Sequence, residues 1–325
     1  MKQNNNKQIH FLAYLNRSGS TLLAKKLNEF KDISVGIELK EKKSAKKFFA
    51  VSEKVLDYWL DQVYLDKKFQ YWNIDRKELK QKLFACPKPI YFHDFLKVAL
   101  KLYFKNDPAK IILHKGRYYL NRINEVDNYF PGAKHVFIDR DPRAIYNSQK
   151  KSIDSTTKKV MNDDVIRFAL GYKRNQKRIK YIQKSKAYKN DLLIIKYENL
   201  IRNEEYELDK VVKFFNTSKE RKPQNNYFDK IPNEQKYLHE NLKKGKLNNR
   251  IDAWKKELET GEIKLLNIAL KYELLSNNYE IYKYNFFTDI FEFTLIKSIL
   301  NFYLKYLPKH LIKTILIKLN IKRNY

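Results

Sequence analysis

Residues 9–23 read IHFLAYLNRSGSTLL and join an apolar run to a short polar turn. The run from Ile9 to Leu15 is almost continuously hydrophobic, which is typical of a strand buried on both faces of a parallel sheet. A segment with helical spacing follows from Ser20 to Phe30. A strand, a tight turn and a helix bring several backbone N–H groups together at the positive end of the helix, where an anion can bind. The stretch therefore predicts an α/β sheet with an anion site at one strand end.

The turn itself consists of Arg17, Ser18, Gly19, Ser20 and Thr21. Gly19 lets the backbone approach an anion closely, and the two hydroxyls after it lie where the helix begins. Arg17 adds a fixed positive charge. A Walker A loop has the pattern GxxxxGK[ST], and this turn has neither the second glycine nor the lysine. By itself the turn predicts a site for phosphate-like oxygens and does not identify the molecule that carries them.

A second candidate anchor lies at residues 135–148, which read HVFIDRDPRAIYNS. The pattern predicts a strand that ends at Arg140, a helix cap at Asp141 and a first helical residue at Pro142. Ser148 then lies two turns inside the helix. Arg140 and Ser148 can therefore reach one further anionic group from a strand end and the helix that follows it.

The rest of the chain continues the alternation of strands and helices. Further β-prone runs are Lys110 to His114, Lys134 to Ile138 and Asp191 to Tyr197, and further helical segments are Phe92 to Phe104, Tyr118 to Tyr129, Asp163 to Ser185 and Asn203 to Phe215. Such alternation predicts an α/β fold with three layers, helix, sheet and helix, around a central and mostly parallel sheet. Ligands of such sheets bind at the carboxyl ends of the strands, where both candidate anchors lie.

On these two motifs the chain resembles the sulfotransferases that use 3′-phosphoadenosine 5′-phosphosulfate (PAPS), in particular their tyrosylprotein and carbohydrate branch. The resemblance implies a P-loop-like fold in which residues 17–21 hold the 5′-phosphosulfate, while Arg140 and Ser148 hold the 3′-phosphate. It extends over most of residues 8–283. The run LIIKYENL at residues 193–200 resembles the family's later strand ending in Y-E-x-L, and residues 250–254 and 263–274 resemble its closing helices.

Glu38 is the candidate base that accepts the proton of an acceptor hydroxyl. In the tyrosylprotein branch, which this region resembles, a catalytic glutamate lies at this distance from the loop within G-E-E, and here Ile37 occupies the middle position. The alternative for Glu38 is a solvated loop residue among the lysines of residues 40–43. His93 and His114 are rival bases, and each is more often structural when it stands alone.

Lys115 follows the predicted strand at residues 110–114 and lies at its carboxyl end. It resembles the family lysine that contacts the leaving-group oxygens, so it is the candidate electrostatic catalyst together with Arg17. Tyr197 is a candidate nucleotide-binding residue that closes over the nucleotide, and Lys244 or Lys246 is a candidate for the same role.

The composition is strongly basic, with 67 lysine and arginine residues against 37 aspartate and glutamate residues and a formal net charge of +30. Such a charge favours polyanionic partners, but an AT-rich coding sequence would give the same composition, so charge alone selects no partner. We find no nucleic-acid-binding motif. The six histidines do not form ligand-spaced pairs with cysteine or carboxylates, so no metal is expected. Cys86 is the only cysteine, which excludes an internal disulfide and favours the reducing cytoplasm.

A boundary in composition falls near Tyr284. We therefore expect a sulfotransferase domain at residues 1–285 and a basic, aromatic and amphipathic helical tail at residues 286–325. Charges within the tail argue against a transmembrane helix. Its faces suit the surface of an anionic bilayer, which would place the protein at the periphery of the inner membrane, or packing against its own core or the partner in a homodimer.

The expected activity is O-sulfation of an acceptor hydroxyl, with PAPS as co-substrate. A glycan, glycolipid or polysaccharide precursor is the preferred acceptor, and a tyrosine hydroxyl or a small alcohol is the alternative. A nucleotide kinase on a similar sheet is the rival enzyme class, but it needs a loop lysine that this turn lacks. A non-catalytic basic protein that binds a membrane or nucleic acid through its charge is the third hypothesis.

Overall fold

The structure, a computed structural model, describes residues 7–39, 49–117, 119–154, 157–185, 188, 190–223, 227, 231 and 250–281. It divides into two compact units. The first comprises the chain as far as Arg140 and again from Tyr181 to Leu247, and the second comprises Asp141–Lys180 and the chain from Asn248 onward. The boundary between Arg140 and Asp141 therefore lies where a strand ends and the next helix begins.

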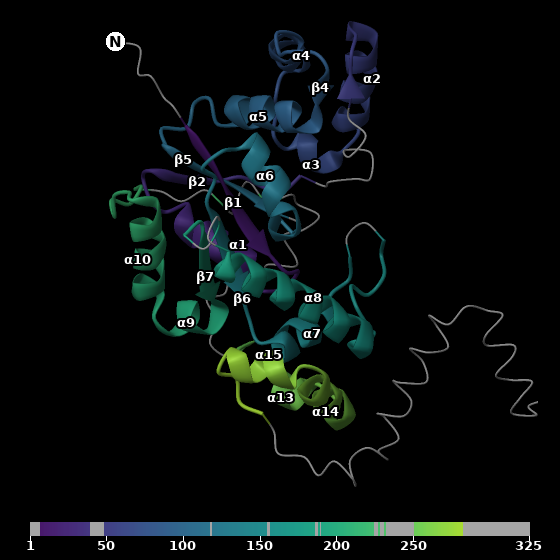
Figure 1. The fold of residues 1–325 in the computed structure, drawn as a ribbon, viewed down its shortest axis with the longest axis vertical. Coiled ribbons are helices and arrows are strands. Elements are labelled where there is room, and N and C mark those ends of the chain that lie inside the picture. The colour runs from purple at the N-terminus through teal and green to yellow at the C-terminus, as the bar shows by residue number, and fades with distance from the viewer. Residues whose placement is uncertain are drawn as a thin grey trace, which may run out of the picture. The chain divides into compact units, whose positions relative to one another are not determined.

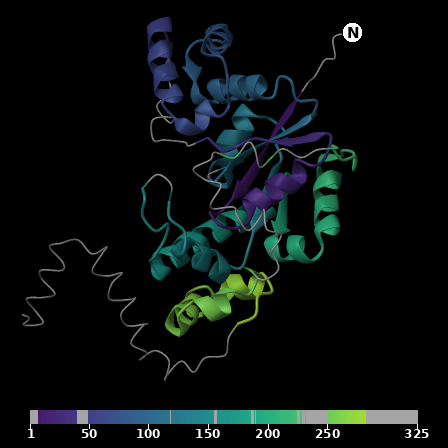
Figure 2. The same cartoon turned by 180° about the vertical axis from the view of Figure 1, so that it is seen from behind.

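The first unit is built around a five-stranded sheet with the strand order β2-β5-β1-β6-β7 (Figures 1 and 2). Its strands are β1 (Gln8–Tyr14), β2 (Ile33–Val35), β5 (Ile111–Gly116), β6 (His135–Asp139) and β7 (Leu192–Lys196). Every neighbouring pair in this sheet is parallel, and helices flank the sheet. The predicted α/β fold with a central parallel sheet is therefore confirmed, and the four predicted strands are present.

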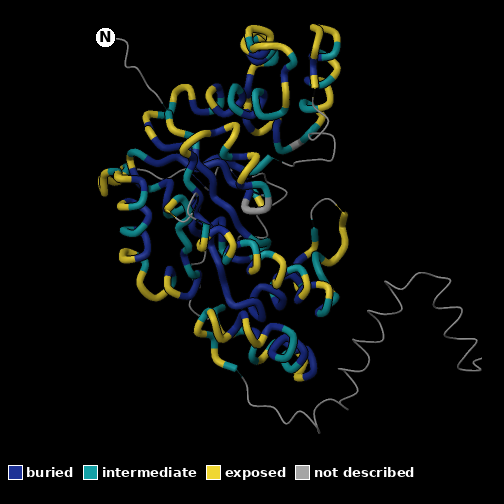
Figure 3. Tube along the Cα trace, viewed as in Figure 1, coloured by how far each residue is buried: buried dark blue, intermediate teal, exposed yellow. Residues whose placement is uncertain are grey.

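β1 lies at the centre of the sheet and is buried on both faces. Phe11, Leu12 and Ala13 have no exposed surface, and β6 is buried along its whole length (Figure 3). Burial on both faces explains why these strands appear in the sequence as continuous apolar runs. The sequence pattern does not predict β2, because its three residues are too short a run to show a strand pattern.

The described helices of the first unit are α1 (Ser20–Leu27), α2 (Glu53–Tyr64), α3 (Lys67–Gln70), α4 (Arg76–Phe84), α5 (Phe92–Tyr103), α6 (Ile123–Tyr129), α9 (Tyr197–Arg202) and α10 (Glu204–Phe215). Helices α1, α5, α6 and α10 agree with predicted segments except at their ends, whereas α2, α3, α4 and α9 are not predicted from the sequence. Residues 49–103 form a helical insertion between β2 and β5. The insertion contains helices α2 to α5 and two short antiparallel strands, β3 (Phe49–Ala50) and β4 (Ile90–Tyr91). The segment predicted from Tyr118, itself outside the described residues, begins as a 3₁₀ helix at Tyr119–Arg122 before α6.

The second unit is helical where the structure describes it. It contains α7 (Pro142–Lys150), α13 (Trp254–Glu257), α14 (Thr260–Ala269) and α15 (Lys271–Ser276), and α8 (Val165–Lys184) begins in it. As predicted, α7 starts at Pro142, and Asp141 Oδ1 accepts a hydrogen bond from the backbone N–H of Arg143 at 2.9 Å. Residues 263–274, which resemble the family's closing helices, contain a break at Leu270, where α14 ends and α15 begins.

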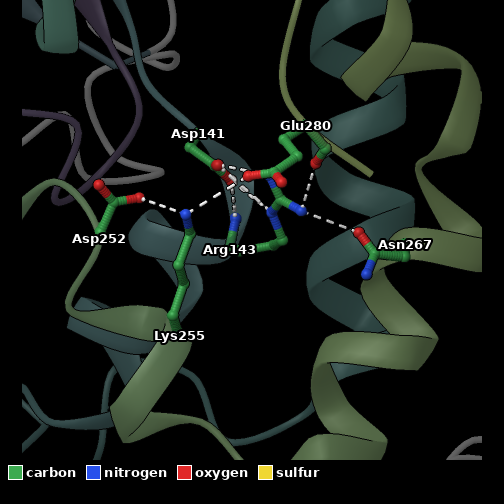
Figure 4. A network of polar contacts seen from close by, with 6 residues as sticks. All are labelled: Asp141, Arg143, Asp252, Lys255, Asn267 and Glu280. Carbon is green, nitrogen blue, oxygen red and sulfur yellow. Dashed lines mark hydrogen bonds and ion pairs between the residues drawn. The ribbon is translucent and has the colours of Figure 1, made fainter. Parts of the chain in front are cut away.

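Arg143 connects three parts of the second unit from a buried position (Figure 4). Its guanidinium donates to both carboxylate oxygens of Asp141 over distances of 2.7 to 3.3 Å. It also donates to Asn267 Oδ1 at 2.9 Å and to the carbonyl oxygen of Glu280 at 2.8 Å, and it lies 3.9 Å from the centre of the Trp254 ring. Because Asp141 caps α7, Arg143 joins the start of this helix to the later helices of the unit.

Several sequence predictions concern residues outside the described part of the chain: the tail at residues 286–325, Lys244 and Lys246, and the lysines of residues 40–43. Within the described part, no helix is both long and apolar enough to cross a membrane. The domain boundary at residue 285 and the contacts of the tail stay predictions.

Replacement of Arg143 with alanine should destabilise the protein by about 3–5 kcal/mol, because Asp141 would keep a buried negative charge without its counter-ion. Urea unfolding followed by far-UV circular dichroism measures the loss. Arg174→Ala removes an exposed arginine of α8 and is the control, which should stay within about 0.5 kcal/mol of the wild type. An equally small effect of Arg143→Ala would show that the network adds no stability.

Candidate active site

The loop between β1 and α1 has the backbone expected of an anion-binding turn. Gly19 precedes α1 with φ 98° and ψ 13°, a left-handed conformation that glycine adopts without steric cost. Arg17 is also left-handed, with φ 70°. The loop closes tightly, since the Ser18 backbone N–H donates to the carbonyl oxygen of Leu15 at 3.1 Å. Turns with left-handed residues just before a helix present successive backbone N–H groups, which is the arrangement that binds anions.

The side chains of this loop are buried and include an unsatisfied hydroxyl. Ser18 is fully buried, and its Oγ has no hydrogen-bond partner among the residues that the structure describes. A buried polar group without a partner costs about 1–3 kcal/mol, so a ligand oxygen at this position would remove the cost. The first turn of α1 reads STLL, and therefore carries no carboxylate that would repel an anion. Both observations fit a phosphate or sulfate group in the loop.

Lys115 lies beside the loop, as its position at the end of β5 predicts. Strand pairing places it opposite Leu12 of β1, and its Nζ donates to Thr21 Oγ1 at 3.2 Å. The side chain is buried, and burial lowers the pKa of Lys115, while attraction to Glu38 acts in the opposite direction. In its charged form the side chain adds a positive charge at the start of α1, where the helix dipole already favours an anion.

Glu38 is near enough to Lys115 for their charges to interact. Its carboxylate forms an ion pair with Lys68 of α3, and its side chain is 25% exposed. Burial would raise the pKa of Glu38, but the positive charges of Lys115, Lys68 and Arg117 outweigh it and lower the pKa to about 2. Glu38 is therefore ionised at neutral pH and held among cations, which distinguishes it from a fully solvated loop glutamate.

The two rival bases pack among aromatic rings. His114 is buried, its Nδ1 is hydrogen bonded to Tyr119 Oη, and burial, opposed by the charge of Glu38, lowers its pKa to about 3. His93 stacks on Tyr129 with the ring centroids 3.5 Å apart, and burial lowers its pKa as well. Aromatic packing accounts for the position of both imidazoles. Across the described residues, no three His, Cys, Asp or Glu side chains form a group that could hold a metal ion.

Arg140 follows β6 and lies next to the loop. Its Nη1 donates to the carbonyl oxygen of Arg17 at 3.2 Å, so the candidate second anchor is bonded directly to the first. Its guanidinium also lies 4.1 Å from the centre of the Tyr197 ring, and that ring packs against Gly19. Ser148 lies on α7 in the second unit, and its pairing with Arg140 stays a prediction.

Sequence reasoning misses three further residues near Glu38: Lys68, Arg117 and Tyr227. Lys68 lies in the short helix α3 of the helical insertion, and no spacing in the sequence links it to Glu38. Arg117 lies just beyond β5, so the rule that ligands bind at strand ends could have identified it. Tyr227 is buried, and burial together with the charge of Glu38 raises its pKa.

The described site combines a loop with the backbone of an anion-binding turn, an arginine bonded to that loop and an ionised carboxylate. The loop can hold a phosphate-like group, and the carboxylate can accept a proton from a group beside it. Lys115 can stabilise negative charge that develops next to the loop. This combination suits the transfer of an anionic group to a hydroxyl.

Comparison with protein families gives one match of more than half the chain. A model described as the sulfotransferase family matches residues 11–221. No curated protein sequence matches significantly.

Several solved structures match this chain, and two of them illustrate the shared fold. A sulfotransferase domain from the curacin biosynthetic pathway is 15% identical, with a TM-score of 0.56, and the match covers 85% of this chain and 100% of that one. A sulfotransferase domain from the olefin synthase of Synechococcus PCC 7002 is 16% identical, with a TM-score of 0.50, and the match covers 82% of this chain and 96% of that one. At these identities the likeness concerns the fold alone.

We expect the stabilising effect of Glu38 to depend on pH. Its pKa is about 2 in the folded chain against an ordinary value of 4.5, so the ion pair stabilises the fold fully above pH 4.5 and progressively less as the pH falls toward 2. The difference in stability between the wild type and Glu38→Gln should therefore be largest near neutral pH and shrink by about 1–2 kcal/mol at about pH 3. Urea unfolding at a series of pH values measures it.

Glu53→Gln is the matched control, because Glu53 pairs with Lys80 at an exposed position where an ion pair contributes little. Its difference from the wild type should change little with pH. A difference for Glu38→Gln that is equally independent of pH would contradict the low pKa.

Proposed function

We propose that this chain, which belongs to the sulfotransferase family, transfers a sulfuryl group from PAPS to a hydroxyl of an acceptor molecule. The observation that carries the proposal is the hydrogen bond from Arg140 to the loop carbonyl of Arg17, which supports the pairing of two candidate anion anchors at one edge of the sheet. A nucleotide with charged groups at both its 5′ and 3′ positions needs two such anchors. PAPS and its product 3′-phosphoadenosine 5′-phosphate (PAP) are nucleotides of this kind.

Residues 17–21 would hold the 5′-phosphosulfate. Backbone N–H groups, the hydroxyls of Ser18, Ser20 and Thr21, and the charge of Arg17 would contact its oxygens. The buried Ser18 hydroxyl supports this role, because it offers a donor that has no partner within the described part of the protein. Arg140 and Ser148 would hold the 3′-phosphate.

When bound, PAPS supplies a sulfuryl group activated by its bond to phosphate. Glu38 accepts the proton of the acceptor hydroxyl as the hydroxyl oxygen forms its bond to sulfur. The bond between sulfur and the bridging phosphate oxygen breaks, the electron pair stays on that oxygen, and PAP is released. Lys115 and Arg17 stabilise the negative charge that develops there. The proposal needs no metal ion.

Binding of the donor would also change Glu38 itself. A carboxylate with a pKa of about 2 is a weak base, and the cations around it cause this low value. The negative charge of a phosphosulfate beside Lys115 would offset these cations and raise the pKa of Glu38. Glu38 would therefore become a stronger base when the donor is in place.

A glycan, glycolipid or polysaccharide precursor is the acceptor that we propose, in preference to a tyrosine hydroxyl or a small alcohol. The basic composition and the amphipathic tail expected at residues 286–325 together suit such substrates. We also propose a cytoplasmic location, with the tail at residues 286–325 in contact with the inner membrane surface, with the protein's own core or with a second copy of the chain.

PAP should bind much more tightly than AMP, because AMP lacks the 3′-phosphate that Arg140 would hold. Arg140→Ala should lower the affinity for PAP by about 10–100-fold and leave that for AMP nearly unchanged, since a charge-assisted hydrogen bond contributes about 1.5–3 kcal/mol. Isothermal titration calorimetry with both nucleotides measures this.

Arg202→Ala, at an exposed arginine of α9, is the control and should keep the preference for PAP. Equal affinity of the wild-type protein for PAP and AMP would refute the proposed function.

Glu38→Gln should abolish sulfation while PAP still binds, because the amide cannot accept a proton. Loss of a general base lowers the rate by about 10²–10⁴-fold. Cells that lack the gene, complemented with either form and labelled with radioactive sulfate, reveal the sulfated metabolites and glycans that depend on the enzyme. Labelled products that persist with Glu38→Gln would exclude Glu38 as the base.

A further inference from the structure

The aromatic ring of Tyr197 touches both anion anchors. A Cβ atom added at Gly19 would lie 2.3 Å from Cδ2 of Tyr197 and 2.8 Å from its Cε2, so the ring rests directly on the loop backbone. The same ring also contacts Arg140, whose guanidinium lies 4.1 Å from the ring centre. One side chain therefore packs against the loop after β1 and the arginine after β6.

Pairing of two strands in the sheet places Tyr197 in this position. β6 pairs with β7 in a register that sets Asp139 opposite Lys196. Arg140 and Tyr197 are the next residues of the two chains, so they leave adjacent strands at the same edge. Tyr197 is 4% exposed and begins α9, which makes its ring a fixed part of the fold.

The guanidinium of Arg140 is thus held by two different interactions. The ring of Tyr197 attracts its positive charge, and the carbonyl oxygen of Arg17 accepts a hydrogen bond from its Nη1. A guanidinium has five N–H donors in one plane, and the hydrogen bond to Arg17 uses one of them. Stacking on a ring restricts the guanidinium plane and lowers the entropy that a ligand must otherwise remove.

We propose that Tyr197 is a positioning residue for the donor nucleotide, which acts through Gly19 and Arg140 and sets the spacing between the 5′ and 3′ anchors. This inference rests on the proposed function, because it assigns the two anchors to one nucleotide. It differs from the role of a lid that closes over the nucleotide, since the buried ring already contacts both the loop and Arg140.

Three substitutions separate the two contacts. Tyr197→Phe keeps the ring and should bind PAP and AMP as the wild type does. Tyr197→Leu fills the space over Gly19 but has no π system, so the affinity for PAP should fall about tenfold while that for AMP stays nearly constant. Tyr197→Ala leaves the loop unsupported as well, so both affinities should fall. Titration calorimetry with each nucleotide measures these constants.

Tyr206→Ala is the control, because Tyr206 lies exposed on α10. It should leave both affinities unchanged. A second test combines Tyr197→Leu with Arg140→Ala: once Arg140 is removed, the leucine should have little further effect on PAP binding, because its effect runs through Arg140.

The outcomes distinguish this inference from the proposed function. If the wild type does not prefer PAP over AMP, the proposed function fails and the inference with it. If the wild type prefers PAP but Tyr197→Leu keeps the full preference, only the inference is overturned. If Tyr197→Leu weakens both nucleotides equally, or adds its full effect to Arg140→Ala, Tyr197 has a packing role alone and the inference is again overturned. Thermal melting confirms that each variant is folded, and should Tyr197→Ala fail to fold, the phenylalanine and leucine variants decide the matter.

Discussion

Parallel pairing of β1 with β5 and β6 is the constraint on which the rest of this structure depends. Because the three strands run in one direction, the residues that follow them reach the same edge of the sheet. The register sets Leu12 opposite Lys115 and Tyr14 opposite Ile138, two residues before Arg140. The register of the sheet therefore brings together the loop, the buried Lys115 and Arg140, although these residues are distant in the sequence.

The parts of this arrangement that could be predicted are those that depend on local pattern. Burial on both faces marks β1 and β6 in the sequence, and the Asp-Pro pair marks the start of α7, because each feature involves residues close together in the chain. Gly19 likewise identifies the left-handed turn. The strand β2 escapes prediction since three residues cannot show a period, and the break at Leu270 between α14 and α15 escapes it because no glycine or proline marks it.

Contacts between segments that are distant in the sequence limit how much of the candidate site can be predicted from the sequence. Glu38 and Lys115 could be named from a resemblance, but their shared electrostatic environment could not, because it includes Lys68 from the helical insertion. An insertion carries no periodic relation to the strand that it follows, so the partner of Glu38 becomes visible only in three dimensions. The low pKa of Glu38 is accordingly a property of the fold and not of its sequence neighbourhood.

The contact between Gly19 and the ring of Tyr197 has a consequence for how this protein can vary over generations. A Cβ atom at residue 19 would lie 2.3 Å from the ring, so a side chain there requires a smaller residue 197, and the left-handed φ of 98° strains it in addition. A smaller residue 197 in turn releases the guanidinium of Arg140 from its ring. The two positions, far apart in the chain, are therefore coupled: a side chain at residue 19 requires a smaller residue 197, and that change removes the ring from Arg140.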